Sequence, residues 1–388
     1  MLKPLSEKAM NLVPSVTLEL SALTKQLKAE GKDIVSFGIG EPDFNVNDEI
    51  KQAAIDAINA DYSHYTDVKG IYALREAISE RLLRENAIEY SPENIMVTNG
   101  AKHALFTCLQ ALVSDNDEVI IPQPYWVSYS EMVKMAGGVP IMVETAFEDS
   151  FLPDAEQIAP LITEKTKVLL INDPINPTGA IFDKNRLSQI AELCVRHGLY
   201  IISDEIYDKF IYDGAKHTSI ASLGDEVKQL TVTVNGFSKT YAMPGWRLGY
   251  AAGAQGVIKA MSSISGQCVS HPSSITQMAG IKALRMDQGF VGEMVKEYDR
   301  RRKYMTGCLD KIKGVRYIYP AGAFYIFTDI SAFSDNSAQF AMSILKEAGV
   351  AVVPGSGFGK EGFIRFSYAC SYEDIVKGME RLTKFLSR

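Results

Sequence analysis

The chain has 388 residues, of which 46% are hydrophobic and 22% charged, a balance typical of folded globular proteins and far from that of disordered segments. This length favours two domains over a single core. The net charge of −7 provides no basic field for nucleic acid or anionic lipid, and no apolar run approaches the length of a membrane span, so we expect a cytoplasmic protein with neither partner.

Between about residues 46 and 285, short β-branched runs alternate with amphipathic stretches. The predicted strands are IMVT (95–98), EVII (118–121), KVLLIN (167–172), LYIIS (199–203) and LTVTV (230–234), and helices are predicted between them, for example at 102–112 and 184–197. Such alternation builds an α/β fold with a mostly parallel sheet and helices on both faces. Ligand sites in these folds lie at the carboxyl ends of the strands.

The pattern changes after about residue 285, where a long charged helix is predicted over 287–312. Further strands are predicted at 323–328, 350–353 and 363–366, helices near 336–348 and 371–386, and the run IVSF (34–37) is a candidate to join them. We therefore predict three segments: 1–45 as an N-terminal arm and part of a small domain, 46–285 as a large domain, and 286–388 as an interdomain helix with the rest of the small domain.

The five cysteines are scattered, with no CxxC pair and no His or Cys cluster at metal-ligand spacing. We interpret them as buried thiols and expect neither disulfides nor a metal site. They are Cys108, Cys194, Cys268, Cys308 and Cys370.

The most informative stretch is NGFSKTYAMPGWRLGY (235–250), which directly follows a predicted strand. It places Lys239 in a turn rich in Ser, Gly and Pro, where local sequence alone favours a solvated loop lysine. Its context changes that interpretation, because this stretch is one of nine motifs that belong together.

These motifs resemble, in order, those of the fold-type I, class I aminotransferases, and in particular the bacterial aspartate aminotransferase-like subgroup I-beta. They are GIGEPDF (38–44), HYTDVKG (64–70), TNGAKHAL (98–105), PYWVSY (124–129), NDPINPTG (172–179), SDEIYDKF (203–210), the lysine segment, PGSGFG (354–359) and IRFSYA (364–369). The resemblance extends over nearly the whole chain. It implies a large domain with a mostly parallel seven-stranded sheet sandwiched by helices, a smaller α+β domain, the cofactor pyridoxal 5'-phosphate, and a homodimer with shared active sites.

The resemblance implies three catalytic residues. Lys239 is the residue expected to form a Schiff base with the cofactor and then to move the proton at the substrate Cα, tasks that need an amine with a lowered pKa. Asp204 is implied as the carboxylate that faces the pyridine nitrogen and keeps it protonated. Tyr207 is implied as the hydroxyl that binds the cofactor O3'.

Other residues are implied to hold the cofactor. Asn176 shares the O3' contact, and Trp126 stacks on the pyridine ring. The phosphate is expected at the start of a helix, where backbone N–H groups and the helix dipole attract an anion. The residues implied there are Gly100, Ala101, Lys102, Ser238 and Arg247, together with Tyr65 from the partner subunit; Gly236 departs from the serine that many relatives carry.

For the substrate, the resemblance implies Arg365 as the guanidinium that binds the α-carboxylate in a bidentate manner, with Gly40, Trp126 and Asn176 beside it. Lys102 is implied to bind a distal carboxylate, with help from Ser15 and Thr17. The expected reaction is therefore transfer of an amino group between aspartate or glutamate and a 2-oxo acid, by a ping-pong mechanism.

The segment GQCVSHPSS (266–274) departs from the polar QSxSNPTS-like run of the subgroup, because Cys268 and His271 stand where Ser and Asn are usual. This departure keeps an aromatic amino acid or prephenate aminotransferase open as an alternative. A pyridoxal-phosphate-dependent β-lyase of the same fold is a further one. His271 is interpreted as a core or interface residue, or alternatively as a group on the substrate side.

Overall fold

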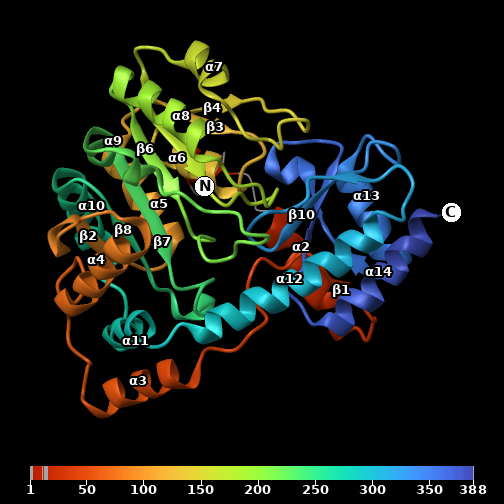
Figure 1. Cartoon of the computed structure of the whole chain (residues 1–388), viewed down its shortest axis with the longest axis horizontal. Coiled ribbons are helices and arrows are strands. Elements are labelled where there is room, and N and C mark those ends of the chain that lie inside the picture. Colours follow the sequence, from red (N-terminus) through yellow and green to blue (C-terminus); the bar gives the residue numbers. More distant parts are fainter. Residues whose placement is uncertain (1–2, 11, 13–15, 388) are drawn as a thin grey trace.

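A seven-stranded sheet forms the larger part of the molecule. The computed structural model describes residues 3–10, 12 and 16–387. In Figure 1 the large sheet and its helices lie at the left of the molecule. A smaller group of strands and helices, which includes β10, α13 and α14, lies at the right. The long helix α12 (Gly289–Leu309) runs between the two parts.

The strand order of the large sheet is β2-β8-β7-β6-β5-β3-β4. Strand β8 is antiparallel to both of its neighbours, and the other pairs are parallel. The strands are β2 (Ile95–Thr98), β3 (Glu118–Pro122), β4 (Val139–Val143), β5 (Thr166–Asn172), β6 (Tyr200–Asp204), β7 (Thr231–Gly236) and β8 (Gly249–Ala252). Central strands such as β7 are buried along their whole length, because helices cover both faces of a parallel sheet.

The helices that accompany this sheet include both of those predicted by residue range. They are α4 (Tyr72–Asn86), α5 (Ala101–Leu112), α6 (Ser128–Met135), α8 (Lys184–His197), α9 (Asp225–Leu230), α10 (Gln255–Cys268) and α11 (Ser274–Arg285). Helix α3 (Asp48–Asn59) packs against α11 and projects from the body of the molecule (Figure 1).

All five strands predicted in this part of the chain are confirmed. Two strands lack a clear signal in the sequence. Strand β4 lies at the sheet edge, contains a proline and is only partly buried, and β8 consists of the small residues GYAA with no β-branched side chain. The predicted mostly parallel α/β architecture is therefore correct.

The smaller part contains two further sheets. Strand β1 (Val35–Ser36) pairs in parallel with β11 (Val350–Ala351), which confirms that the run IVSF joins this part. The other sheet has the order β12-β13-β10-β9, formed by β9 (Arg316–Tyr317), β10 (Tyr325–Asp329), β12 (Val353–Pro354) and β13 (Phe363–Ser367). Helices α2 (Val16–Ala29), α13 (Ser337–Ser343) and α14 (Tyr372–Leu386) belong here, and a π-helical turn, Ile344–Ala348, follows α13. The segment limits at residues 45 and 285 stay a prediction.

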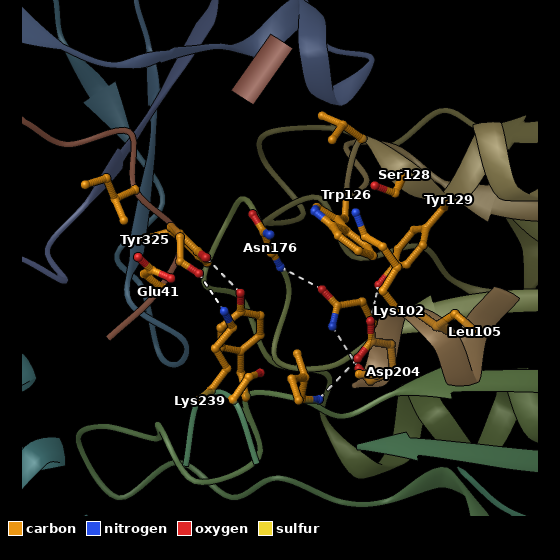
Figure 2. A pocket seen from close by; sticks show the side chains of 18 of the residues that line it. Glu41, Lys102, Leu105, Trp126, Ser128, Tyr129, Asn176, Asp204, Lys239 and Tyr325 are labelled. Carbon is orange, nitrogen blue, oxygen red and sulfur yellow. Dashed lines mark hydrogen bonds between the residues drawn. The ribbon is translucent and has the colours of Figure 1, made fainter. Parts of the chain in front are cut away.

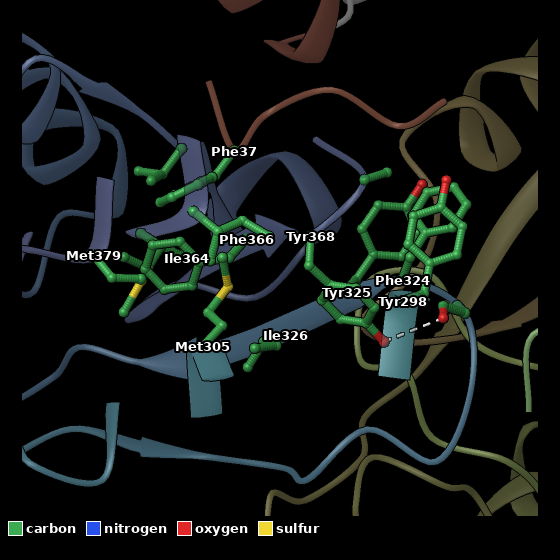
Figure 3. Packing of buried hydrophobic residues seen from close by; sticks show 14 of the residues in the cluster. Phe37, Tyr298, Met305, Phe324, Tyr325, Ile326, Ile364, Phe366, Tyr368 and Met379 are labelled. Carbon is green, nitrogen blue, oxygen red and sulfur yellow. Dashed lines mark hydrogen bonds between the residues drawn. The ribbon is translucent and has the colours of Figure 1, made fainter. Parts of the chain in front are cut away.

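A continuous apolar core joins α12, α14 and the strands of the smaller part. Figure 3 shows Phe37, Met305, Phe366 and Met379 packed together, with aromatic rings such as Tyr325 at the side nearest the large sheet. Because strands β10 and β13 share this core, the side chains that they direct toward the large sheet are held on a rigid support.

All five cysteines are free. Cys108 and Cys194 are buried as expected, but Cys268 is exposed at the last position of α10, so the expectation of a buried thiol is wrong there. Across residues 3–10, 12 and 16–387, no helix is long and apolar enough to cross a membrane, and no three His, Cys, Asp or Glu side chains are grouped to hold a metal ion.

The contact between β8 and the start of α5 allows a test of the fold. A Cβ added at Gly249 would lie 2.5 Å from the Ala101 backbone nitrogen, whereas a Cβ at Gly256 of α10 would meet no atom within 4 Å. We predict that Gly249→Ala lowers the free energy of unfolding by about 1–3 kcal/mol, because backbone must move. Urea denaturation measures this, with Gly256→Ala as the matched control, which should be neutral or stabilising by up to about 1 kcal/mol. Equal effects of the two substitutions would contradict the close packing.

Candidate active site

A cavity of about 440 Å³ opens between the large sheet and the smaller part of the molecule. The ends of β5 and β6 and the turn after β7 form its floor, and Tyr325 and Arg365 line it from β10 and β13. The segment after β1 and the start of α5 close its sides. This is the location expected for a ligand at the carboxyl ends of parallel strands.

Asp204 is the last residue of β6 and only 4% exposed. The Tyr129 hydroxyl donates a hydrogen bond of 2.7 Å to its Oδ2, and the Ile206 backbone N–H donates one of 3.2 Å to its Oδ1 (Figure 2). Burial raises the pKa of the Asp204 carboxyl to about 6, although these hydrogen bonds oppose the shift. A buried carboxylate that is oriented by hydrogen bonds can stabilise a cationic group of a ligand bound in the cavity.

Lys239 lies in the turn that follows β7, as predicted, and its side chain enters the same cavity (Figure 2). Its Nζ donates a hydrogen bond of 2.6 Å to the Gly40 carbonyl. Burial lowers the pKa of the Lys239 amine to about 8, against the opposing effect of the Glu41 and Asp204 carboxylates. The amine is therefore readily deprotonated, which a nucleophile or general base requires.

Arg365 approaches the cavity from β13 and is only 2% exposed. Its guanidinium donates to Asn176 Oδ1 at 2.9 Å and to the Gly38 carbonyl at 3.0 Å, and it lies over the Tyr325 ring. Its buried Nε has no hydrogen-bond partner within residues 3–10, 12 and 16–387. Each terminal nitrogen of a guanidinium carries two hydrogens, so those of Arg365 can also donate to an anionic oxygen in the cavity that this residue lines.

Asn176 is held in turn by the large sheet. Asn172, the last residue of β5, accepts a 2.8 Å hydrogen bond from the Asn176 backbone N–H and donates one of 2.8 Å to the Asp204 carbonyl. This chain connects the floor of the cavity with Arg365.

Tyr207 also reaches the cavity, where its hydroxyl lies 2.7 Å from that of Tyr325. Burial raises the pKa of the Tyr207 hydroxyl well above its usual value, so the group is protonated and can donate a hydrogen bond. A Cβ at Gly40 would lie 2.9 Å from the Tyr325 hydroxyl, so glycine is needed for this close approach.

The start of α5 forms a cradle for an anion. Gly100 precedes the helix with φ 83°, and the Arg247 guanidinium lies directly beside it, donating to the Asn99 carbonyl at 3.1 Å. A Cβ at Gly100 would lie 2.5 Å from Arg247 Nη2. Together with Ala101 and Ser238 in the cavity wall, these groups combine helix N–H donors, a hydroxyl and a positive charge.

Lys102 and Trp126 form another wall of the cavity. The Lys102 Nζ lies 4.7 Å from the centre of the Trp126 ring, a cation–π contact. Burial, and then the charge of Arg247, lowers the pKa of the Lys102 amine. The indole also packs edge-on against Tyr129, which fixes its plane.

Most of the predicted site residues therefore line one cavity. Gly100 lies behind its wall, in contact with Arg247. Tyr65 lies outside it and is 91% exposed. Ser15 lies outside the described residues, and so does the side chain of Thr17.

Two tyrosines of the cavity escaped the sequence interpretation. Tyr129 belongs to the motif PYWVSY but was assigned no role, and Trp126 precedes α6 (Ser128–Met135), so no helical spacing relates the two residues. Tyr325 lies in a predicted strand of the smaller part, and nothing in its local sequence indicates that its hydroxyl meets that of Tyr207, 118 positions away.

The sequence matches a known protein family over most of its length. Residues 32–382 match the family model described as aminotransferase class I and II. The chain belongs to the class I and II aminotransferases. Its relatives include an aspartate aminotransferase from Bacillus sp., 43% identical over 98% of this chain and 99% of that protein, and an aspartate/prephenate aminotransferase from Thermus thermophilus, 42% identical over 100% of both.

Solved structures place this aminotransferase in the same fold. The aspartate aminotransferase from Thermus thermophilus with maleate superposes with a TM-score of 0.96 at 41% identity, covering 99% of this chain and 100% of that one. An aromatic aminotransferase from Pyrococcus horikoshii superposes with a TM-score of 0.89 at 44% identity, covering 94% and 98%. The predicted fold-type I architecture is thus confirmed.

The buried amine of this aminotransferase has a measurable consequence. In protein freed of any bound cofactor, labelling of Lys239 by fluorodinitrobenzene should rise with pH around a midpoint of about 8, because only the neutral amine reacts and burial lowers its pKa. Peptide mass spectrometry from pH 6 to 11 measures this, with the exposed Lys296 as internal reference. A midpoint for Lys239 near about 10.4, usual for a solvated lysine, would contradict the described environment.

Proposed function

We propose that the chain is a pyridoxal 5'-phosphate-dependent aminotransferase that moves amino groups between aspartate or glutamate and 2-oxo acids by a ping-pong mechanism. One observation carries the proposal: the Lys239 amine, the Asp204 carboxylate and the Arg365 guanidinium line a single cavity. The family and the names of the relatives support it.

The residues present fit this cofactor. It needs an amine for its aldehyde, an acid for its ring nitrogen, donors for its phosphate and a flat wall for its ring, and Lys239, Asp204, the start of α5 with Arg247 and Ser238, and Trp126 offer these groups. The buried Asp204 carboxylate is the most specific of them, because in a low-dielectric site it favours a cationic partner. When bound, pyridoxal phosphate supplies an electron-withdrawing ring that stabilises negative charge on the substrate Cα.

Residues of this chain would then transfer the proton, orient the cofactor ring and exclude water. Lys239 Nζ would take the proton from the substrate Cα and deliver it to the cofactor carbon that carried the aldehyde, since its lowered pKa lets it hold and release a proton near neutral pH. The Tyr207 hydroxyl and the Asn176 amide would orient the ring from the side of its O3' atom, and Trp126 would fix its plane. The walls from the smaller part would exclude water from the reacting atoms.

Arg365 would bind the α-carboxylate of the substrate. Its two terminal nitrogens are oriented by hydrogen bonds to Asn176 and Gly38, and each keeps a second hydrogen for a ligand. A planar guanidinium matches a carboxylate and fixes the direction of the Cα–H bond.

The preference for acidic substrates rests on Lys102. Its ammonium group faces the cavity, and a second lysine, Lys25 of α2, also lines it. Two cations in the lining of the cavity favour a second carboxylate. The relative solved with maleate, a dicarboxylate, supports the same preference.

A second candidate is transfer from aromatic amino acids or prephenate. The observation that favours it is the apolar lining formed by Ile39, Leu105 and Trp126 beside Lys102. Relatives named aspartate/prephenate and aromatic aminotransferases share its fold.

The proposal includes a homodimer with shared sites. The Tyr65 side chain is 91% exposed, and Ile55, Ile58 and Tyr62 of the adjoining segment are exposed by 48%, 57% and 40%. Such a group of apolar side chains is expected at an interface. A second copy would cover it and would bring Tyr65 to the partner's phosphate cradle.

We predict that Lys239→Ala abolishes the visible imine absorbance of the bound cofactor and lowers the rate of amino transfer on the order of 10⁴-fold, because amine and general base are lost together. Absorption spectra and assays with aspartate and 2-oxoglutarate measure both. Lys296→Ala, at an exposed position of α12, is the control and should change neither. Retention of both signals in Lys239→Ala would refute the assignment.

Arg365→Ala and Lys102→Ala should separate the two carboxylate sites. The first should lower kcat/KM about 100-fold for every amino donor, because a charged hydrogen bond to the common α-carboxylate is lost. Lys102→Ala should lower it about 10-fold or more for aspartate and glutamate and much less for alanine or phenylalanine. Equal losses for alanine and aspartate in Lys102→Ala would contradict the distal-carboxylate role.

The same assays distinguish transfer from elimination. Transfer requires a 2-oxo acid acceptor, so release of pyruvate and ammonia from a β-substituted amino acid without any acceptor, at a rate above amino transfer, would favour a β-lyase and overturn the proposal.

A further inference from the structure

The loop that carries Tyr65 is fixed at its base although the tyrosine ring is exposed. The Thr66 backbone N–H donates a hydrogen bond of 3.0 Å to Nε2 of His271, a residue 205 positions later. The Tyr65 ring itself meets the His271 ring edge-on, with ring centres 5.7 Å apart and an angle of 86° between the planes. An exposed side chain with a fixed base projects in a defined direction.

The partners of His271 determine its tautomer. Its Nδ1 lies 2.8 Å from the Pro272 carbonyl oxygen, which can only accept. Nδ1 therefore carries the hydrogen, and Nε2 keeps the lone pair that accepts from Thr66. Both ring nitrogens are thus occupied, and His271 does not line the cavity, so it is not a substrate-side group of its own subunit.

The other end of the loop is held by the buried Gln277 of α11. Its Oε1 accepts from the Ile71 backbone N–H at 2.7 Å, and its Nε2 donates to the Pro272 carbonyl at 2.8 Å. The Pro272 carbonyl thus receives hydrogen bonds from both side chains. His271 and Gln277 together fix the loop against α11. His271 accepts from the Thr66 N–H next to Tyr65, and Gln277 Nε2 also donates a longer hydrogen bond of 3.3 Å to the Thr66 hydroxyl.

We propose that His271 is a positioning residue for Tyr65: by accepting from the Thr66 N–H and packing against the tyrosine ring, it directs the Tyr65 hydroxyl toward the cofactor phosphate bound by a second copy of the chain. This inference rests on the proposed function and its homodimer. It assigns a task to the position where the motif of the subgroup usually has asparagine.

The physical benefit is preorganisation. An unrestrained exposed side chain loses rotational freedom when it binds, which weakens binding by up to about 10-fold. A tyrosine already oriented by His271 avoids much of this loss. Asparagine at position 271 could still accept from the Thr66 N–H through its side-chain oxygen, whereas alanine could not.

The test measures the dissociation constant of pyridoxal 5'-phosphate from the dimeric protein, by absorbance titration after removal of the cofactor. We expect His271→Ala to raise this constant about 10-fold and His271→Asn to restore it to within about 3-fold of the original. His197→Ala, at an exposed position in the last turn of α8, is the matched control and should leave it unchanged. Gel filtration and thermal melting verify that each variant remains folded and dimeric.

A double substitution decides whether the effect passes through Tyr65. Tyr65→Phe should itself weaken cofactor binding, and His271→Ala added to Tyr65→Phe should weaken it by less than about 2-fold further. Additive effects, failure of His271→Asn to restore binding, or an unchanged constant in His271→Ala would overturn the inference. If Tyr65→Phe has no effect while Lys239 still binds the cofactor, the inference fails and the proposed lysine chemistry survives.

Discussion

The site depends on two opposite charges at the carboxyl ends of adjacent parallel strands, where the surrounding protein removes much of their hydration. Asp204 at the end of β6 has a raised pKa and Lys239 after β7 a lowered one, for the same reason, which is burial. Each charge is expensive alone, so the cavity favours a ligand that offers a cation to the carboxylate and an electrophile to the amine. The charges of Asp204 and Lys239 at the floor of the cavity therefore favour a ligand of this kind.

The large sheet supplies the precision that this arrangement needs. Strands β5, β6 and β7 are hydrogen-bonded in register, with Asn172 beside Asp204 and Asp204 beside Val234. The smaller part contributes Arg365 and Tyr325 from two paired strands that share one core. The cavity is therefore lined from both parts of the molecule, and α12 runs between these parts (Figure 1).

How much the sequence could predict follows from the range of each interaction. The central parallel strands and α8 were predictable, because burial on both faces and helical periodicity are local signals, whereas the partly buried edge strand β4 gave no such signal. The cavity residues were predictable through the motif resemblance, which places Lys239 and Asp204 without any knowledge of distance. Strand β8 was missed because GYAA has no strand-forming side chain. The pairing of the Tyr207 and Tyr325 hydroxyls and the bond from Thr66 to His271 join positions more than a hundred residues apart, and only the fold brings them together.

The proposed chemistry requires that the Lys239 amine binds the cofactor aldehyde. The most direct measurement is borohydride reduction of the protein loaded with pyridoxal 5'-phosphate, followed by digestion and mass mapping of the labelled peptide. The account predicts one label per chain, on the lysine of the segment NGFSKTYAM. A label on Lys102 or on any other lysine, or no label at all, would contradict it.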